Sequence, residues 1–258
     1  MSGILVEYQN HIAIVKLNNP GRANALSRFL LDDLAHCVKL LAGDQTLRAV
    51  VFSAGESRAF CAGADLKERQ TMTEPEIVSY VGLLRDTFQQ IAHLPMPTIA
   101  AIKGLALGGG CELALSCDIR VMEEDALIGL TEVSWGIIPG AGGTQRLSQL
   151  VGVGKAKELI FTAKKLAAAE AERIGLVEHV CGIDGADLKA LQLAQEIAKQ
   201  APVSVRLAKA AIRSYDASLL QSGLDAEWVY YQQTIPTEDR LEGLAAFREK
   251  RQPVYQGK

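Results

Sequence analysis

The sequence predicts an α/β fold that ends in a helical region, and three observations support this prediction. The chain has 258 residues, of which 48% are hydrophobic and only 5% aromatic, so it can bury one large core. Short apolar segments alternate with helical patterns in the N-terminal part, whereas only helical patterns follow Gly182. We therefore expect an α/β core domain over residues 1–182 and a helical C-terminal region over residues 183–258.

Four short segments have the apolar composition of buried strands, namely residues 11–17, 47–52, 98–102 and 119–122. Between the first two, apolar residues recur at helical spacing from Leu26 to Leu41, and Ser27 is the expected N-cap. Strands that are separated by helices imply crossover connections, which give a largely parallel and buried sheet.

In the C-terminal region we expect four helices, over residues 186–200, 203–215, 219–234 and 238–250. Pro202 and Pro236 lie near the starts of two of them, where a missing N–H costs little. The last residues, 252–258, are expected to form a loop.

Charge and cysteine usage restrict the partners and the compartment. A net charge of −3, from 27 basic and 30 acidic side chains, argues against nucleic acid or an anionic membrane as a partner. No apolar run approaches the roughly 20 residues of a membrane span, and the first residues lack the pattern of a signal or transit peptide. We therefore expect a cytoplasmic protein.

The five cysteines are odd in number, show no paired spacing and are expected to be free thiols: Cys37, Cys61, Cys111, Cys117 and Cys181.

Several common catalytic motifs are absent. The sequence has no Gly-x-Ser-x-Gly elbow and no phosphate-binding loop, and Gly152-Val-Gly154 does not continue as a dinucleotide fingerprint. The four histidines show no metal-ligand spacing. We therefore expect no metal centre and no redox or nucleotide cofactor.

Three glycine-rich segments lie at the junctions that open helices, at residues 60–67, 104–114 and 129–146. Glycines there let backbone N–H groups approach a ligand closely, and two such groups from separate loops would form an oxyanion hole. The alternative is that these glycines serve only tight turns and close helix–strand packing.

Two glutamates accompany these segments. Glu112 lies one turn into the helix that Gly108 opens, and Glu132 lies in a mostly apolar stretch. An acid that is buried among apolar neighbours has a raised pKa, which suits general acid–base catalysis. Each alone could be a helix cap or a member of a buried ion pair, but two such acids beside glycine-rich loops favour catalysis.

From Asn24 to Arg251 the chain resembles the enoyl-CoA hydratase/isomerase (crotonase) family. The resemblance is carried, in order, by Ala-Gly-Ala-Asp (62–65), Gly-Gly-Gly-Cys-Glu (108–112) and Pro-Gly-Ala-Gly-Gly-Thr-Gln-Arg (139–146). It implies a core of repeated ββα units wound into a spiral, and a C-terminal helical region that assembles a homotrimer or a dimer of trimers (a hexamer).

The resemblance also implies roles for individual residues. The amides of Ala64 and Gly109 would form the oxyanion hole, Glu112 and Glu132 would be the catalytic carboxylates, and the Gly140 amide would help to hold the water. CoA is then part of the substrate, and no separate cofactor is expected. The positions that match CoA contacts, the last two contributed by a neighbouring subunit, are Arg22, Ala23, Ala25, Ala62, Ala64, Asp65, Leu66, Lys67, Phe247 and Lys250. From the residues alone, Arg22 could equally be a solvated loop charge.

Both glutamates are present, whereas isomerases of the family typically keep only the later one, so we expect an enoyl-CoA hydratase: reversible syn addition of water to a 2-enoyl-CoA thioester. Residues 61–69, 117–121 and 233–243 most resemble methylglutaconyl-CoA hydratases of leucine degradation, which is the first alternative. Fatty acid metabolism and aromatic degradation also use such a reaction. Further alternatives are an isomerase, another crotonase reaction or an RNA-binding relative.

The lysine row of RNA-binding relatives is replaced here by Asp32, His36 and Leu40, so we expect no nucleic-acid partner.

Overall fold

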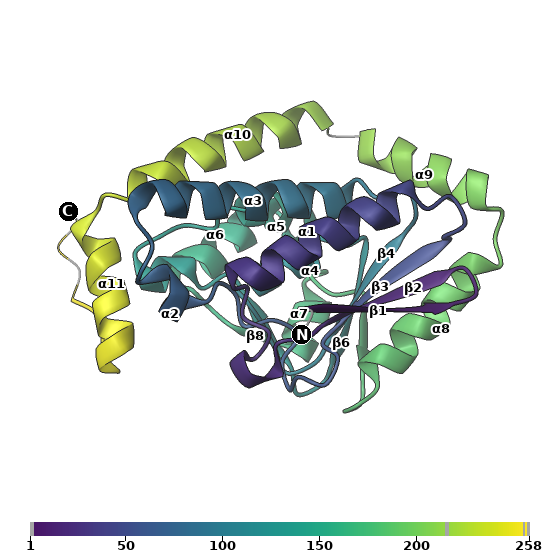
Figure 1. The fold of residues 1–258 in the computed structure, drawn as a ribbon, viewed down its shortest axis with the longest axis horizontal. Coiled ribbons are helices and arrows are strands. Elements are labelled where there is room, and N and C mark those ends of the chain that lie inside the picture. Colours follow the sequence, from purple (N-terminus) through teal and green to yellow (C-terminus); the bar gives the residue numbers. More distant parts are fainter. Residues whose placement is uncertain (1–2, 215–216, 255, 257–258) are drawn as a thin grey trace.

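A six-stranded sheet forms the centre of the molecule (Figure 1). The computed structural model describes residues 3–214, 217–254 and 256. All neighbouring strands of this sheet are parallel except the first pair, which is antiparallel. In spatial order its strands are β1 (Ile4–Gln9), β2 (Ile12–Leu17), β3 (Ala49–Ser53), β4 (Thr98–Ile102), β6 (Ile119–Glu123) and β9 (His179–Cys181).

A smaller sheet lies beside the first and consists of β5 (Leu105–Leu107), β7 (Leu127–Gly129) and β8 (Leu166–Ala167). The chain passes from the large sheet to the small one at β4–β5 and again at β6–β7, and each time a helical segment follows. An isolated β-bridge pairs Cys61 with Ala106 of β5, so the segment after β3 also passes from the large sheet to the small one. The chain therefore winds as successive ββα units.

The helical elements account for most of the remaining described chain. The single-turn 3-10 helices are η1 (Pro20–Arg22) and η2 (Glu132–Trp135). The α-helices up to residue 173 are α1 (Arg28–Gly43), α2 (Leu66–Arg69), α3 (Glu74–Ala92), α4 (Gly109–Ser116), α5 (Gly143–Val151), α6 (Val153–Phe161) and α7 (Ala168–Arg173). Those beyond it are α8 (Ala186–Ala198), α9 (Pro202–Ser214), α10 (Ala217–Thr234) and α11 (Glu238–Glu249).

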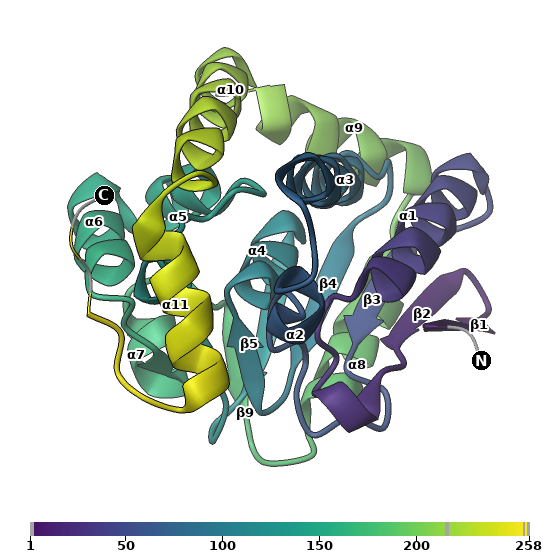
Figure 2. The ribbon, with the colours of Figure 1, turned by 60° about the vertical axis from the view of Figure 1, so that its left-hand side comes forward.

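Helices cover both faces of the large sheet because its strands present apolar side chains on both sides. On one face, Ile14, Val51 and Ile99 pack against Ala190 and Ala194 of α8. The alternate residues of the same strands face the main core, which includes the buried sides of α1, α3 and α4. Figure 2 shows α1 and α3 on the side of the sheet away from α8.

The predicted N-terminal elements are confirmed. Strands occur in all four segments, and the Ser27 hydroxyl caps α1 by accepting a hydrogen bond from the Leu30 amide at 3.2 Å. The largely parallel sheet is also as expected. The sequence interpretation missed β1, β5, β7, β8 and β9, four of which have only two or three residues.

The four predicted C-terminal helices correspond to α8–α11, with bounds that differ by a few residues at most. Tyr215, and residues 255, 257 and 258 of the expected terminal loop, lie outside the described residues. The first of these helices, α8, packs on the large sheet although it falls in the range assigned to the C-terminal region. The division of the chain at residue 182 stays a prediction.

Candidate active site

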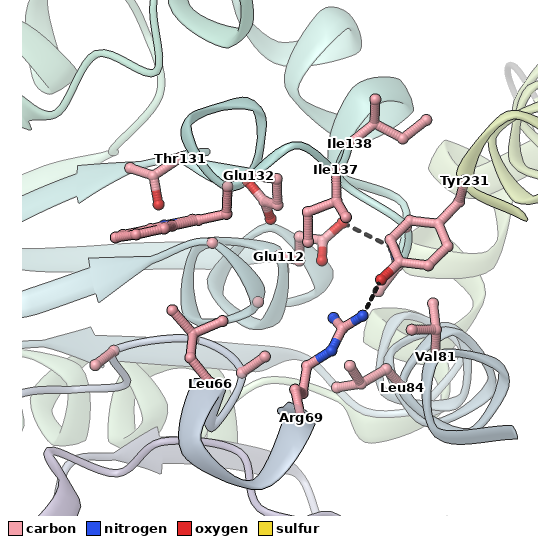
Figure 3. Close-up of a pocket in the computed structure, with 18 residues that line it drawn as sticks. Leu66, Arg69, Val81, Leu84, Glu112, Thr131, Glu132, Ile137, Ile138 and Tyr231 are labelled. Carbon is pink, nitrogen blue, oxygen red and sulfur yellow. Dashed lines mark hydrogen bonds between the residues drawn. The ribbon is translucent and has the colours of Figure 1, made fainter. Parts of the chain in front are cut away.

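All five predicted catalytic residues line one pocket (Figure 3). The space between its lining residues, including solvent at the opening, is about 550 Å³. The walls come from α2, α3, α4, η2, the loop after η2, and α10. The predicted set found there is Ala64, Gly109, Glu112, Glu132 and Gly140.

The amides of Ala64 and Gly109 lie beside each other at one wall of the pocket. Leu26 and Ala64 form a β-bridge. The Leu26 amide donates to the Gly63 carbonyl and the Leu26 carbonyl accepts from the Asp65 amide, so the Ala64 amide takes no part in these hydrogen bonds. Gly109 is the first residue of α4, where an amide has no acceptor within the helix. Within residues 3–214 neither amide has an acceptor. Both are therefore available to a ligand oxygen.

Two glycines let these amides come together. Gly63 has φ +95°, and a Cβ there would lie 2.7 Å from the Leu107 carbonyl oxygen. A Cβ on Gly110 would lie 2.0 Å from the Cys61 carbonyl oxygen. Any side chain at Gly110 would push α4 away from the segment that carries Ala64. These glycines therefore serve close packing, as one of the two alternatives left open by the sequence predicted, and the binding of a ligand oxygen by the two amides stays a prediction.

Glu112 is held by the loop that begins α5. It is 3% exposed, and its Oε1 accepts hydrogen bonds from the amides of Ala141 (2.8 Å) and Gly143 (2.9 Å). Burial raises the pKa of Glu112, with the neighbouring carboxylates Glu132 and Glu227 adding to the rise and the two amides opposing it. Glu112 is therefore a buried acid whose anion is supported by two fixed donors.

Glu132 has a different environment. It is 8% exposed at the start of η2, and neither carboxyl oxygen has a hydrogen-bond partner within the described residues. Burial raises its pKa to about 8. Its carboxyl oxygens face the pocket beside Glu112 (Figure 3).

The sequence interpretation missed two polar residues of this pocket. Arg69, at the end of α2, is 6% exposed and donates a hydrogen bond to the Tyr231 hydroxyl at 2.6 Å. Its guanidinium also lies over the rings of Tyr80 (5.8 Å) and Tyr231 (5.9 Å). No carboxylate of the described chain forms a salt bridge with Arg69. No local motif joins residues 69 and 231, so the sequence carries no signal that could have identified them. Their burial in one pocket is visible only in the structure.

The predicted CoA-contact residues are only partly in the pocket. Ala62 and Leu66 line it, whereas Arg22 forms a 2.5 Å ion pair with Asp65, which caps α2. The others near the mouth, Ala23, Ala25 and Lys67, lie outside the pocket lining. A CoA contact for any of these residues stays a prediction.

The two C-terminal candidates lie on or next to α11, which packs against η2 of the same chain. Phe247 makes an edge-to-face contact with Trp135, with ring centroids 5.4 Å apart. Trp135 lines the pocket, so Phe247 contacts a lining residue without lining the pocket itself. Lys250, the left-handed C-cap residue of α11, is exposed. Their predicted action on a neighbouring subunit stays a prediction.

Within the described residues, no group of three or more His, Cys, Asp or Glu side chains is arranged to hold a metal ion. None of the helices described combines the length and the apolar character that are needed to cross a membrane.

Comparisons with known proteins agree with the geometry. The sequence profile described as enoyl-CoA hydratase/isomerase matches residues 7–258. A Bacillus subtilis protein described as a putative enoyl-CoA hydratase/isomerase is 48% identical, covering 96% of this chain and 95% of its own. Human mitochondrial methylglutaconyl-CoA hydratase is also 48% identical, over 98% of this chain and 76% of its own. The crystal structure of an enoyl-CoA hydratase from Bacillus anthracis superposes with a TM-score of 0.81 at 46% identity, and that of carnitinyl-CoA hydratase from Mycobacterium avium with 0.90 at 32%, each over 100% of both chains. The chain therefore belongs to the enoyl-CoA hydratase/isomerase (crotonase) family.

Proposed function

We propose that the protein is a hydro-lyase that adds water reversibly across the 2,3 double bond of a 2-enoyl-CoA thioester. The observation that supports this proposal is the meeting of two buried carboxyl groups and two amides without acceptors in one pocket. An acyl thioester needs no redox group for this reaction, only proton transfer and stabilisation of the charge on its carbonyl oxygen.

The two amides are proposed to stabilise that charge. When water adds to C3 of a conjugated enoyl thioester, negative charge accumulates on the thioester oxygen as an enolate. The amides of Ala64 and Gly109 converge from separate segments and are proposed to donate to this oxygen. A preorganised donor of this kind contributes about 3–4 kcal/mol to transition-state stabilisation.

The hydrogen bonds of the two glutamates support a division of labour between them. Two carboxylates buried in one pocket do not both ionise easily, so the pair retains a proton at neutral pH. Burial raises the pKa of both groups, and the charge of Arg69 opposes the rise at Glu132. Two amides donate to Glu112, whereas neither oxygen of Glu132 has a hydrogen-bond partner among the described residues, and on this geometry we propose that the shared proton resides on Glu132. We therefore propose Glu112 as the base and Glu132 as the acid.

The proposed step balances as follows. Glu112 removes a proton from water as the water oxygen bonds to C3, and the C2=C3 π electrons shift toward the thioester carbonyl. Glu132 then transfers its proton to C2 as the enolate collapses. The Gly140 amide is proposed to help to hold the attacking water, since Gly140 lines the pocket next to the loop that binds Glu112.

The test of the reaction class is the loss of the absorbance of the conjugated enoyl group after the protein is mixed with crotonyl-CoA. We expect turnover that depends on enzyme concentration. A folded protein that binds CoA yet hydrates neither crotonyl-CoA nor 3-methylglutaconyl-CoA would contradict the proposal and favour another reaction of the family.

Arg69 favours a second, narrower candidate, in which the acyl chain carries a carboxylate of its own, as in 3-methylglutaconyl-CoA. A buried cation is costly unless it is paired, and Arg69 faces the pocket without a carboxylate partner in the described chain. A substrate carboxylate would supply this partner. The similarity to human methylglutaconyl-CoA hydratase is consistent with this candidate.

Arg69→Gln tests this specificity. We expect the ratio of kcat/KM for 3-methylglutaconyl-CoA to that for crotonyl-CoA to fall by about thirtyfold or more, because one partner of a buried charge pair is removed. Arg173→Gln, at an exposed arginine on α7, is the matched control and should leave the ratio unchanged. Equal losses for both thioesters in Arg69→Gln would contradict a role in recognising a carboxylate.

The oligomeric state, the absence of a nucleic-acid partner and the cellular location stay predictions. A homotrimer or hexamer is supported by exposed apolar side chains on α9: Val203, Leu207 and Ile212 are 66%, 64% and 76% exposed. The exposed side of α1 presents Asp32, His36 and Leu40, in agreement with the expectation that no nucleic acid binds. Cytoplasmic location also stays a prediction, and the human relative is described as mitochondrial.

A further inference from the structure

A third buried carboxylate, Glu227, lies next to the active site but does not line the pocket. It is carried by α10 and is 3% exposed. A buried charge is costly unless hydrogen bonds and opposite charges compensate it, so its partners indicate what it does.

The partners of Glu227 are in the loop that holds Glu112. Its two oxygens accept from the Gly142 amide at 2.5 Å and the Thr144 amide at 2.9 Å, and the second oxygen also accepts from the Thr144 hydroxyl. The amides of Ala141 and Gly143 donate to Glu112. Four successive amides, 141 to 144, are thus shared alternately between a pocket carboxylate and Glu227.

The same face of α10 contacts the other end of this loop. Tyr231 lies four residues after Glu227, which places both side chains on one side of the helix. Its ring packs on Gly140 so closely that a Cβ there would lie 2.5 Å from the ring. Gly140 is therefore held by Tyr231, and Gly142 and Thr144 are held by Glu227.

We propose that Glu227 is a positioning residue for the hydration inferred above: it fixes the 140–144 loop so that two amides point at Glu112 and the Gly140 amide stays at the pocket. The inference rests on the proposed function. In this role Glu227 does not contact the substrate, because it lies behind the loop rather than in the pocket lining. Its effect passes through the geometry of the loop and through its charge.

The charge of Glu227 acts on both pocket acids. Burial raises the pKa of Glu227 itself, and the Thr144 and Gly142 donors and the charge of Arg146 oppose that rise. The anion of Glu227 raises the pKa of Glu112 and of Glu132, in addition to the larger effect of burial. Removing this charge should therefore lower both pKa values. The charged or titratable groups around the cluster are Arg146 from α5, Glu112 from α4, Glu132 from η2, Arg69 from α2 and Tyr231 from α10.

The test compares Glu227→Gln with Asp225→Asn on the same helix. Glutamine retains one acceptor but turns an N–H group toward a donor amide, so the loop loses a contact and the cluster loses a charge. We expect kcat for crotonyl-CoA to fall about 10- to 100-fold with KM changed far less, and both limbs of the pH profile to move to lower pH. Asp225, an exposed partner of Arg85, should change neither quantity when it is replaced.

The outcomes distinguish a positioning role of Glu227 from a purely structural one and from failure of the proposed function. A lower kcat with shifted limbs supports the inference. An unchanged kcat, or a lower kcat at all pH values with unshifted limbs and a lower Tm, would overturn it, because a structural contact alone would produce that pattern. If the wild-type protein itself hydrates no enoyl thioester, the proposed function fails and the inference falls with it, which the wild-type arm of the same assay reveals.

Discussion

Replacing Glu132 with glutamine is expected to lower kcat for hydration of crotonyl-CoA by about 10²–10⁴-fold, the range for loss of a general acid or base. The side chain keeps its shape but loses the proton that C2 must receive. Since neither oxygen of Glu132 has a hydrogen-bond partner in the described chain, the substitution removes no hydrogen bond of the described fold. The measurement is steady-state turnover beside Glu124→Gln, an exposed neighbour that should leave kcat unchanged.

The pH dependence follows from the raised pKa of Glu132. Wild-type kcat/KM should fall as pH rises past about 8, because the ionised acid has no proton to give. The folded state also binds this proton more tightly than the unfolded chain does. The wild-type protein therefore loses free energy of unfolding as pH rises from the ordinary value of 4.5 through about 8.

Glu132→Gln lacks this pH-dependent loss of stability. Its Tm relative to wild type should rise toward alkaline pH, which a thermal unfolding series at several pH values measures. A variant that keeps kcat within about tenfold of wild type would exclude Glu132 as the acid. A Tm difference that does not change with pH would show that Glu132 is not buried as a neutral acid.

Replacing Glu112 with glutamine is the second substitution with a large expected effect, again about 10²–10⁴-fold on kcat. Both amide hydrogen bonds go to a single oxygen, Oε1, so a glutamine carbonyl can accept both and keep the loop in place. Only the capacity to remove a proton from water is lost. Near-wild-type Tm with collapsed hydration is therefore the expected combination.

Proton exchange distinguishes the two glutamates from each other. In D₂O, exchange of the C2 proton of butyryl-CoA requires the group that serves C2 but no attack by water on C3. Glu112→Gln should retain much of this exchange while losing hydration, whereas Glu132→Gln should lose both. The reverse pattern would exchange the proposed roles of acid and base.

The elements that the sequence predicted are those whose pattern is long enough to be read locally. The helix after Ser27 shows seven buried apolar residues at helical spacing, and the strand at 98–102 is a continuous apolar run. The small sheet was missed because β5, β7 and β8 have two or three residues each, too few to show a period of two. Their pairing is a tertiary contact.

The catalytic candidates were predicted because two acids in apolar stretches accompany glycine-rich segments, and because these motifs resemble those of the family. Glycine-rich turns at helix starts predicted the exposed amides, and acids in apolar stretches predicted buried carboxyl groups. Arg69, Glu227 and Tyr231 show no such signal. They lie in ordinary helical patterns, and their roles depend on partners that are distant in sequence.

The sequence by itself determined the fold class, the family and the two acids of the site, because each is encoded in neighbouring residues. Only the tertiary structure decided how the acids differ: Glu112 accepts hydrogen bonds from two amides, and Glu132 accepts none from the described residues. It also decided that α10 brings Glu227 and Tyr231 onto a loop that lies some 85 residues before Glu227 in the chain. The physical reason is that hydrogen-bond partners and desolvation, which set the protonation of a carboxyl group, come from segments that meet only when the chain folds.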